Sequence, residues 1–139
     1  MKLHRIVIAL ALVACGSAST DTKAAFPSDA YSTITTDAGS YRVEIRTAPS
    51  QPPVRGDLDL ALRVFDAHGA PVDGLALTVV PWMATHGHGA SVVPSVTPLG
   101  NGAYHVEHVD LFMPGRWMLQ MTLGAGSTAD HATASLDVE

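Results

Sequence analysis

The stretch "LDLALRVFD", residues 58–66, carries the pattern that decides the fold prediction. Apolar side chains occur at every second position, so an extended chain would place them all on one side. The residues expected to face inward are Leu58, Leu60, Leu62 and Val64. On the other side Asp59 and Arg63 are charged, as expected for a strand with one face on the core and one in water.

Similar segments recur on both sides of this stretch, separated by turns that contain Gly with Pro, Asp or Asn. In the strand expected at 116–124, the inward residues are Trp117, Leu119, Met121 and Leu123. The expected strands are 41–47, 58–66, 75–83, 102–112, 116–124 and 131–139, with a further short strand within 91–98. This spacing, without helical periodicity, predicts an all-β fold: an immunoglobulin-like antiparallel β-sandwich of about seven strands. A small closed barrel is the alternative.

Composition excludes several classes of function. The 139 residues suit one folded domain, and a net charge of -5 with only eight Lys and Arg leaves no basic stripe for nucleic acid. The chain has no Gly-x-Ser-x-Gly elbow, no HExxH and no phosphate-binding glycine loop. We therefore expect neither an enzyme nor a small-molecule substrate.

The N-terminus has the pattern of an export signal. Lys2 and Arg5 precede the apolar segment "IVIALALVA", which ends in the lipobox-like "LVAC" at Cys15. This predicts a lipoprotein signal peptide at residues 1–15 and a lipid on Cys15 that anchors the protein in the bacterial envelope, facing the periplasm. Gly16 favours the outer membrane over the inner one. The alternative is ordinary cleavage after Ala18, which would discard Cys15.

Residues 16–39 are rich in Ser, Thr, Ala and Asp and show no sustained period, so they predict a flexible tether. As a coil, such a segment would span on the order of 25 to 30 Å on average. The folded domain is then expected at residues 40–139. Cys15 is the only cysteine of the chain, so the domain holds neither a disulfide nor a thiolate metal site.

A cluster of potential metal ligands lies in "PWMATHGHGASVVP", residues 81–94. Outside the cytoplasm imidazole and thioether are the available copper ligands, since soft sulfur favours Cu(I) and imidazole suits both oxidation states. On an extended segment His86 and His88 would point to the same side, and the adjacent glycines would let the backbone turn. We therefore predict a copper site formed by Met83, His86 and His88, with Met113 as the first additional ligand.

Other ligand sets stay open. Met118, His105 and His108 are further candidates for copper, while zinc would need a set such as His86, His88, His105 and Glu107. In the simpler interpretation, Met83 packs at a strand end and the two loop histidines are solvated. Strand alternation would send His105 and His108 to opposite faces unless a β-bulge intervenes. The rival function is then a structural or adaptor module that docks onto an envelope protein partner.

The chain resembles the YtkA-like domain, which is related to the periplasmic part of FixH-type proteins. The resemblance rests on "VFDAHGAPVDG" (64–74), "PWMATHGHG" (81–89) and above all "GAYHVEHVDLFMPGRWMLQMTL" (102–123), and it covers roughly residues 40–124. It implies an immunoglobulin-like fold outside the cytoplasm and a role in copper handling or oxidase assembly. FixH-type proteins carry a transmembrane anchor, which a lipid on Cys15 would replace here.

Overall fold

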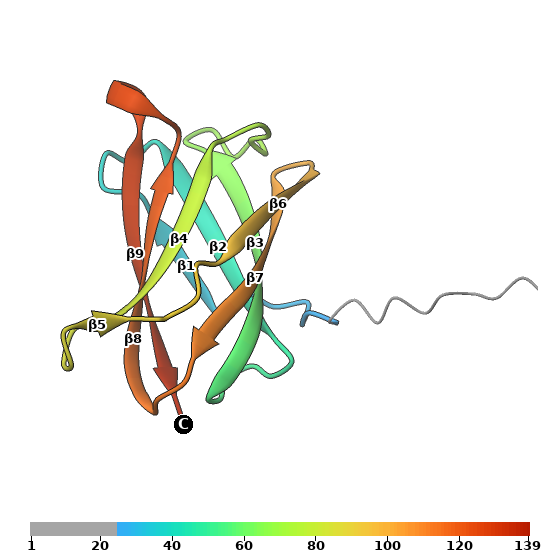
Figure 1. The fold of residues 1–139 in the computed structure, drawn as a ribbon. Coiled ribbons are helices and arrows are strands. Elements are labelled where there is room, and N and C mark those ends of the chain that lie inside the picture. Colours follow the sequence, from blue (N-terminus) through green and yellow to red (C-terminus); the bar gives the residue numbers. More distant parts are fainter. Residues whose placement is uncertain (1–24) are drawn as a thin grey trace, which may run out of the picture.

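In the computed structural model, which describes residues 25–139, the strands form two antiparallel sheets that pack face to face (Figure 1). One sheet has the order β1 (Ser32–Thr35), β2 (Tyr41–Ala48), β3 (Gly56–Asp66), β7 (Ala103–Leu111) and β6 (Ser95–Gly100). The other has the order β5 (His88–Gly89), β4 (Leu77–Met83), β8 (Gly115–Leu123) and β9 (Asp130–Val138), with a short 3-10 helix, η1 (Gly126–Thr128), before β9. The predicted β-sandwich is confirmed, and the closed-barrel alternative is wrong.

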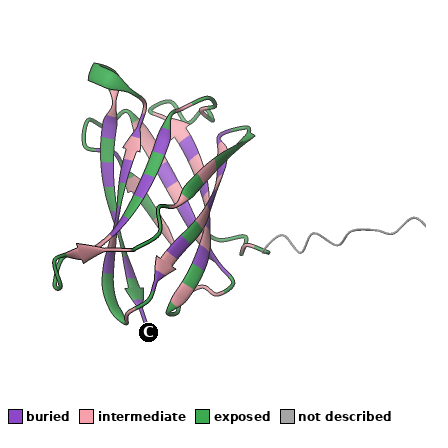
Figure 2. Ribbon diagram, viewed as in Figure 1, coloured by how far each residue is buried: buried purple, intermediate pink, exposed green. Residues whose placement is uncertain are grey.

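The core lies between the two sheets and follows the alternation seen in the sequence. Figure 2 shows buried and exposed positions alternating along the strands. The four residues expected to face inward on β3, and the four on β8, are all at most 2% exposed. Each such side chain contributes roughly 1.5 to 3 kcal/mol by leaving water. The repeated apolar positions therefore determine which face of each sheet turns inward.

The structure contains two short strands, β1 and β5, beyond the seven expected. β1 pairs with β2 from Ser32 opposite Ile45 to Thr35 opposite Arg42, so the prediction of a tether at residues 16–39 was wrong for this part. Its sequence, "STIT", is rich in β-branched residues, but four residues are too few to show a period. Residues 1–24, which include the predicted signal peptide and Cys15, lie outside the described residues. Within residues 25–139, no helix is long and apolar enough to cross a membrane.

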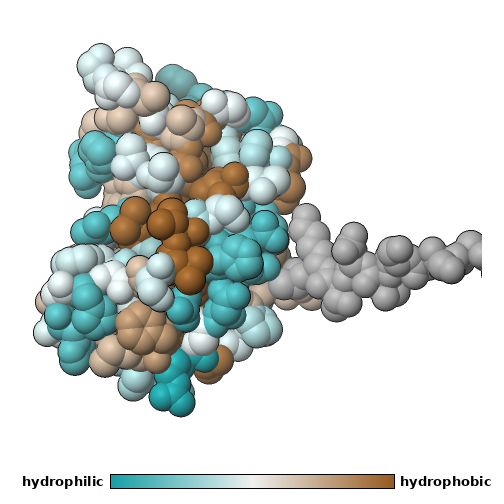
Figure 3. Space-filling view, in the orientation of Figure 1, coloured by the Kyte–Doolittle hydropathy of each residue, from teal (hydrophilic) through white to brown (hydrophobic). Residues whose placement is uncertain are grey.

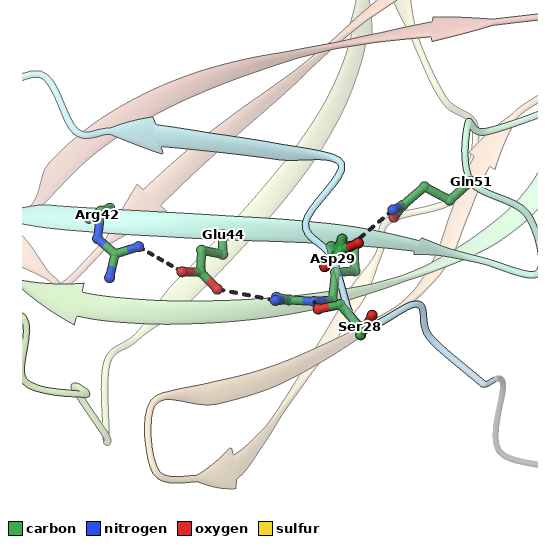
Figure 4. A network of polar contacts seen from close by, with 6 residues as sticks. Ser28, Asp29, Arg42, Glu44 and Gln51 are labelled. Atoms are coloured by element: carbon green, nitrogen blue, oxygen red, sulfur yellow. Dashed lines mark hydrogen bonds and ion pairs between the residues drawn. The ribbon is translucent and has the colours of Figure 1, made fainter.

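The segment before β1 is fixed to the outer face of the five-stranded sheet (Figure 4). The Arg46 guanidinium donates a hydrogen bond to the Ser28 carbonyl at 3.1 Å, and the Gln51 amide donates to the Asp29 carbonyl at 3.0 Å. Glu44 holds Arg46 in place through an ion pair of 3.2 Å. The ordered domain therefore begins well before residue 40.

A buried carboxylate links the two sheets at the start of β9. Asp130 is 4% exposed and accepts hydrogen bonds from the backbone N–H groups of Ala38 (3.0 Å), Ser40 (3.2 Å) and His131 (2.8 Å). Ala38 and Ser40 belong to the loop between β1 and β2, in the other sheet. The hydroxyl of Thr36 and then the Ala38 N–H hold the pKa of Asp130 well below its usual range, against the opposing effect of desolvation.

This carboxylate makes the stability of the domain sensitive to acid. Since the folded-state pKa lies below the unfolded value of about 3.8, the stabilisation is present above that value and is lost as the pH falls below about 4. We expect Asp130→Asn to lower the urea midpoint at pH 7 and to lose less stability than the wild type between pH 5 and pH 2. Asp37→Asn, at an exposed position in the same loop, is the control. If the free energy of unfolding fell equally with pH in the wild type and in Asp130→Asn, Asp130 would not be the source of the acid sensitivity.

Candidate metal-binding hairpin

The predicted ligands of residues 81–94 lie on a hairpin formed by β4 and β5. Met83 pairs with His88, and four residues connect the two strands. The carbonyl of Met83 accepts hydrogen bonds from the N–H groups of His86 (3.2 Å) and Gly87 (3.0 Å), which closes the turn. Gly87 has a φ of 68°, a conformation that glycine adopts without the steric cost of a Cβ. The expected extended segment is thus a tight turn, with His86 in the loop and His88 in the strand.

The turn brings the two imidazoles next to each other. Their ring centroids are 5.7 Å apart, and the planes are tilted by 39°. His86 is exposed, whereas His88 is partly buried. The Nδ1 atom of His88 lies 3.2 Å from the carbonyl oxygen of Gly89. Because a carbonyl can only accept, Nδ1 carries the proton in this arrangement, and the lone pair of the neutral ring is on Nε2.

Two aromatic side chains support His88. Its ring stacks on Phe112 with a centroid distance of 5.6 Å and an interplanar angle of 17°, and it contacts the edge of Trp117 at 6.3 Å. Phe112 and Trp117 meet each other edge to face at 5.4 Å. Sequence reasoning did not assign Phe112 to the site. The only signal was its position directly before Met113 in the turn between β7 and β8.

The two predicted methionine ligands occupy different environments. Met83 is fully buried in the hydrophobic core, and its Cε atom would lie 3.4 Å from a Cβ placed on Gly115. Met113 is partly buried, packs against the core and accepts the indole N–H of Trp117 with its carbonyl oxygen at 2.9 Å. The hairpin and the β7–β8 turn therefore lie side by side. Of the two methionines, Met83 is thus part of the core, and only Met113 is partly exposed.

The other histidine candidates lie on the outer face of the five-stranded sheet. A bulge opposite Asp59 interrupts the pairing of β3 with β7, and His108 adopts a φ of 62° there. The predicted split onto two faces therefore does not occur: both histidines are on the outer side. His105 Nε2 lies 3.0 Å from Asp59 Oδ2, and His108 Nδ1 lies 3.6 Å from Asp57 Oδ2. Both imidazoles thus have carboxylate neighbours on their own sheet.

The residues of the alternative zinc site do not come together at the hairpin, and Met118 lies on a different side of the sheet. Within residues 25–139, no group of three or more His, Cys, Asp or Glu side chains is arranged to hold a metal ion. Glu107 lies 4.0 Å from His105 Nδ1 on β7. Met118 is on the outward side of β8, opposite Trp82. What the hairpin itself offers is a pair of imidazoles, and the β7–β8 turn that contains Met113 lies beside it.

The fold and the hairpin together define the class of the protein: a small all-β sandwich domain that presents side chains on its end loops. The chain belongs to the YtkA-like family, whose model matches residues 35–122, more than half of the 139 residues. No curated protein and no solved structure matches the chain. The resemblance of residues 40–124 to a YtkA-like domain is thereby confirmed, while the relation to FixH-type proteins stays a prediction.

The close approach of β5 to β4 depends on Gly89. A Cβ at this position would lie 2.9 Å from the carbonyl oxygen of Pro81, so β5 would have to move away. We expect Gly89→Ala to destabilise the hairpin by about 1 to 3 kcal/mol, the usual range for overpacking, and to speed hydrogen exchange of the β4–β5 amides. Ser91→Ala, at an exposed position two residues further on, should leave exchange unchanged. Equal exchange in the two variants would argue against a tight β4–β5 contact.

Proposed function

We propose that this YtkA-like domain binds a copper ion at the tip of the β4–β5 hairpin, with His86 and His88 as ligands. The observation that carries the proposal is the pair of adjacent imidazoles, with centroids 5.7 Å apart, in which the Nδ1···Gly89 contact leaves the Nε2 lone pair of His88 free. A hydrogen bond on one ring nitrogen orients the other toward a metal, as in established histidine sites. Met113 is the candidate thioether ligand.

Copper suits this donor set better than zinc does. Zinc sites usually collect three or four imidazole, thiolate or carboxylate groups, and the hairpin supplies two imidazoles. Imidazole with thioether is a combination that copper accepts, and the thioether favours Cu(I). We omit Met83 from the ligand set, because binding a shared ion would draw a fully buried side chain out of the core.

The proposed role is metal handling or oxidase assembly at the cell envelope. The support comes from the family and from the "LVAC" sequence, whose Cys15 would carry the lipid anchor on the periplasmic side. The outer membrane is preferred because Gly16 follows the cysteine. The second candidate function is docking to an envelope protein partner through the same end of the sandwich, for which exposed Phe112, beside His88, is the supporting observation.

Copper titration of two variants tests the site. His86→Ala removes an exposed ring, and His88→Phe keeps a ring that can stack on Phe112 and Trp117 but removes the nitrogen. We expect the affinity for Cu(I) to fall at least about tenfold in each variant, equivalent to about 1.4 kcal/mol or more for a lost ligand. The control is His68→Ala, in the exposed turn after β3.

The pH dependence of the same titration identifies the kind of ligand. Since a protonated imidazole cannot coordinate, the affinity should fall as the pH drops through the ordinary imidazole range, near about 6.5. An affinity that is flat from neutral to mildly acidic pH would rule out imidazole ligands. Unchanged affinity in both histidine variants would place the copper elsewhere, and no binding by the wild type would favour the adaptor function.

Lipidation can be tested separately. In cells fed labelled palmitate, the wild-type protein should incorporate the label and partition into the detergent phase of Triton X-114, because acyl chains supply membrane affinity. Cys15→Ser should do neither. The mass of the mature N-terminus decides between the two cleavage predictions, since cleavage after Ala18 would leave an unlabelled chain without Cys15.

A further inference from the structure

An exposed phenylalanine lies in the β7–β8 turn beside the hairpin. Phe112 directly follows β7 and is 40% exposed, although turns usually carry polar residues or glycine. Figure 3 shows apolar side chains at the surface of the face on which Figure 1 shows β5 and the end of β7. The ring of Phe112 contacts two others, Trp117 at 5.4 Å and His88 at 5.6 Å between centroids. This exposed ring is therefore in direct contact with a candidate metal ligand.

The contact with Phe112 fixes the plane of the His88 imidazole. The two rings are stacked, because their planes differ by only 17°. Trp117 meets His88 at 68° and 6.3 Å, so it restrains the imidazole from a second direction. A histidine side chain turns about two bonds, and a strand of two residues such as β5 has little stability with which to restrain it. The orientation of the ring therefore depends on its aromatic neighbours.

The same contact leaves the coordinating nitrogen free. A metal ion binds an imidazole through a lone pair in the ring plane, whereas a stacked ring occupies the face, so the two do not compete. The Nδ1 atom of His88 lies 3.2 Å from the Gly89 carbonyl oxygen, which leaves the lone pair on Nε2. Phe112 thus fixes the plane of the imidazole, and Gly89 fixes which nitrogen faces away from the backbone. The direction of the Nε2 lone pair is defined before an ion binds.

We propose that Phe112 is the positioning residue of the candidate copper site. It holds His88 in the ring orientation and the Nδ1–H tautomer that present Nε2 to the ion. This proposal rests on the proposed copper-binding function and specifies how one of its ligands is kept ready. The turn that carries Phe112 is itself fixed to the core, because the indole N–H of fully buried Trp117 donates to the Met113 carbonyl at 2.9 Å. The support runs from the core through Trp117 and Phe112 to His88.

The first test uses the metal-free, full-length protein in detergent solution, with 15N-labelled histidine. At about pH 8, above the ordinary imidazole range, the nitrogen chemical shifts report the tautomer of each neutral ring. We expect His88 to be a single Nδ1–H tautomer in the wild type and in Phe112→Tyr, which keeps the ring. Phe112→Leu keeps an apolar side chain but removes the ring, so it should give a mixture of tautomers. The matched control is Phe65→Leu, which removes a ring that contacts Arg42 on the other sheet.

The second test is a Cu(I) titration of the same proteins. Phe112→Leu should weaken binding about tenfold, a usual loss when a group that orients a metal ligand is removed, and Phe112→Tyr should bind as the wild type does. In the His88→Phe background, Phe112→Leu should cause no further loss, because a residue that acts through His88 then has nothing to position.

The outcomes separate this proposal from the proposed function. A His88 tautomer that is unchanged in Phe112→Leu would overturn the positioning role and leave copper binding standing. An equal loss of affinity with and without His88 would mean that Phe112 acts on the hairpin as a whole, which also overturns it. Failure of the wild type to bind copper would overturn both proposals, even if the tautomer depends on Phe112. A mixture of tautomers in Phe112→Leu, with a loss of affinity that disappears in His88→Phe, would support the proposal.

Discussion

The packing of Trp117 connects the hydrophobic core to the candidate site. This residue is fully buried on β8, its indole N–H donates to the carbonyl of Met113, and its ring contacts both Phe112 and His88. The β7–β8 turn and the β4–β5 hairpin thus meet on one rigid aromatic side chain. A hairpin with a two-residue second strand has little stability of its own, so the position of His88 depends on this contact with the core.

The turn geometry limits how the two histidines approach each other. Gly87 allows the backbone to reverse between them, and the close approach of Gly89 to Pro81 keeps β5 against β4. His88 is held on two sides, by its ring contacts and by the Gly89 carbonyl, whereas His86 is exposed in the loop. In the proposed copper site, His88 would therefore be the preorganised ligand and His86 the adjustable one, so a bound ion would set the final rotamer of His86.

The main strands could be predicted from sequence because alternation over seven or more residues leaves one choice of inward face. On β3 and β8 every predicted inward residue is buried. β1 and β5 could not be predicted in this way, since strands of four and two residues show no period. The bulge at His108 shifts the side-chain alternation by one residue, and a sequence pattern does not reveal such an insertion. For the candidate site, the His-x-His spacing marked His86 and His88 as candidate ligands, and this stays a prediction. The burial of Met83 and the stacking of Phe112 on His88 could not be predicted, because they depend on strands distant in sequence.

The N-terminal segment and the β4–β5 hairpin lie on different sides of the domain. Residues 28 and 29 are bound to Arg46 and Gln51 on the outer face of the five-stranded sheet, where His105 also pairs with Asp59. The hairpin belongs to the other sheet and projects away from the point where the N-terminal segment leaves the domain (Figure 1). The side chain of Arg46 fixes the N-terminal segment, whereas the side of the hairpin carries the exposed ring of Phe112. A chain attached through its N-terminus would therefore present the hairpin away from the attachment, so that a ligand can reach it without displacing the segment.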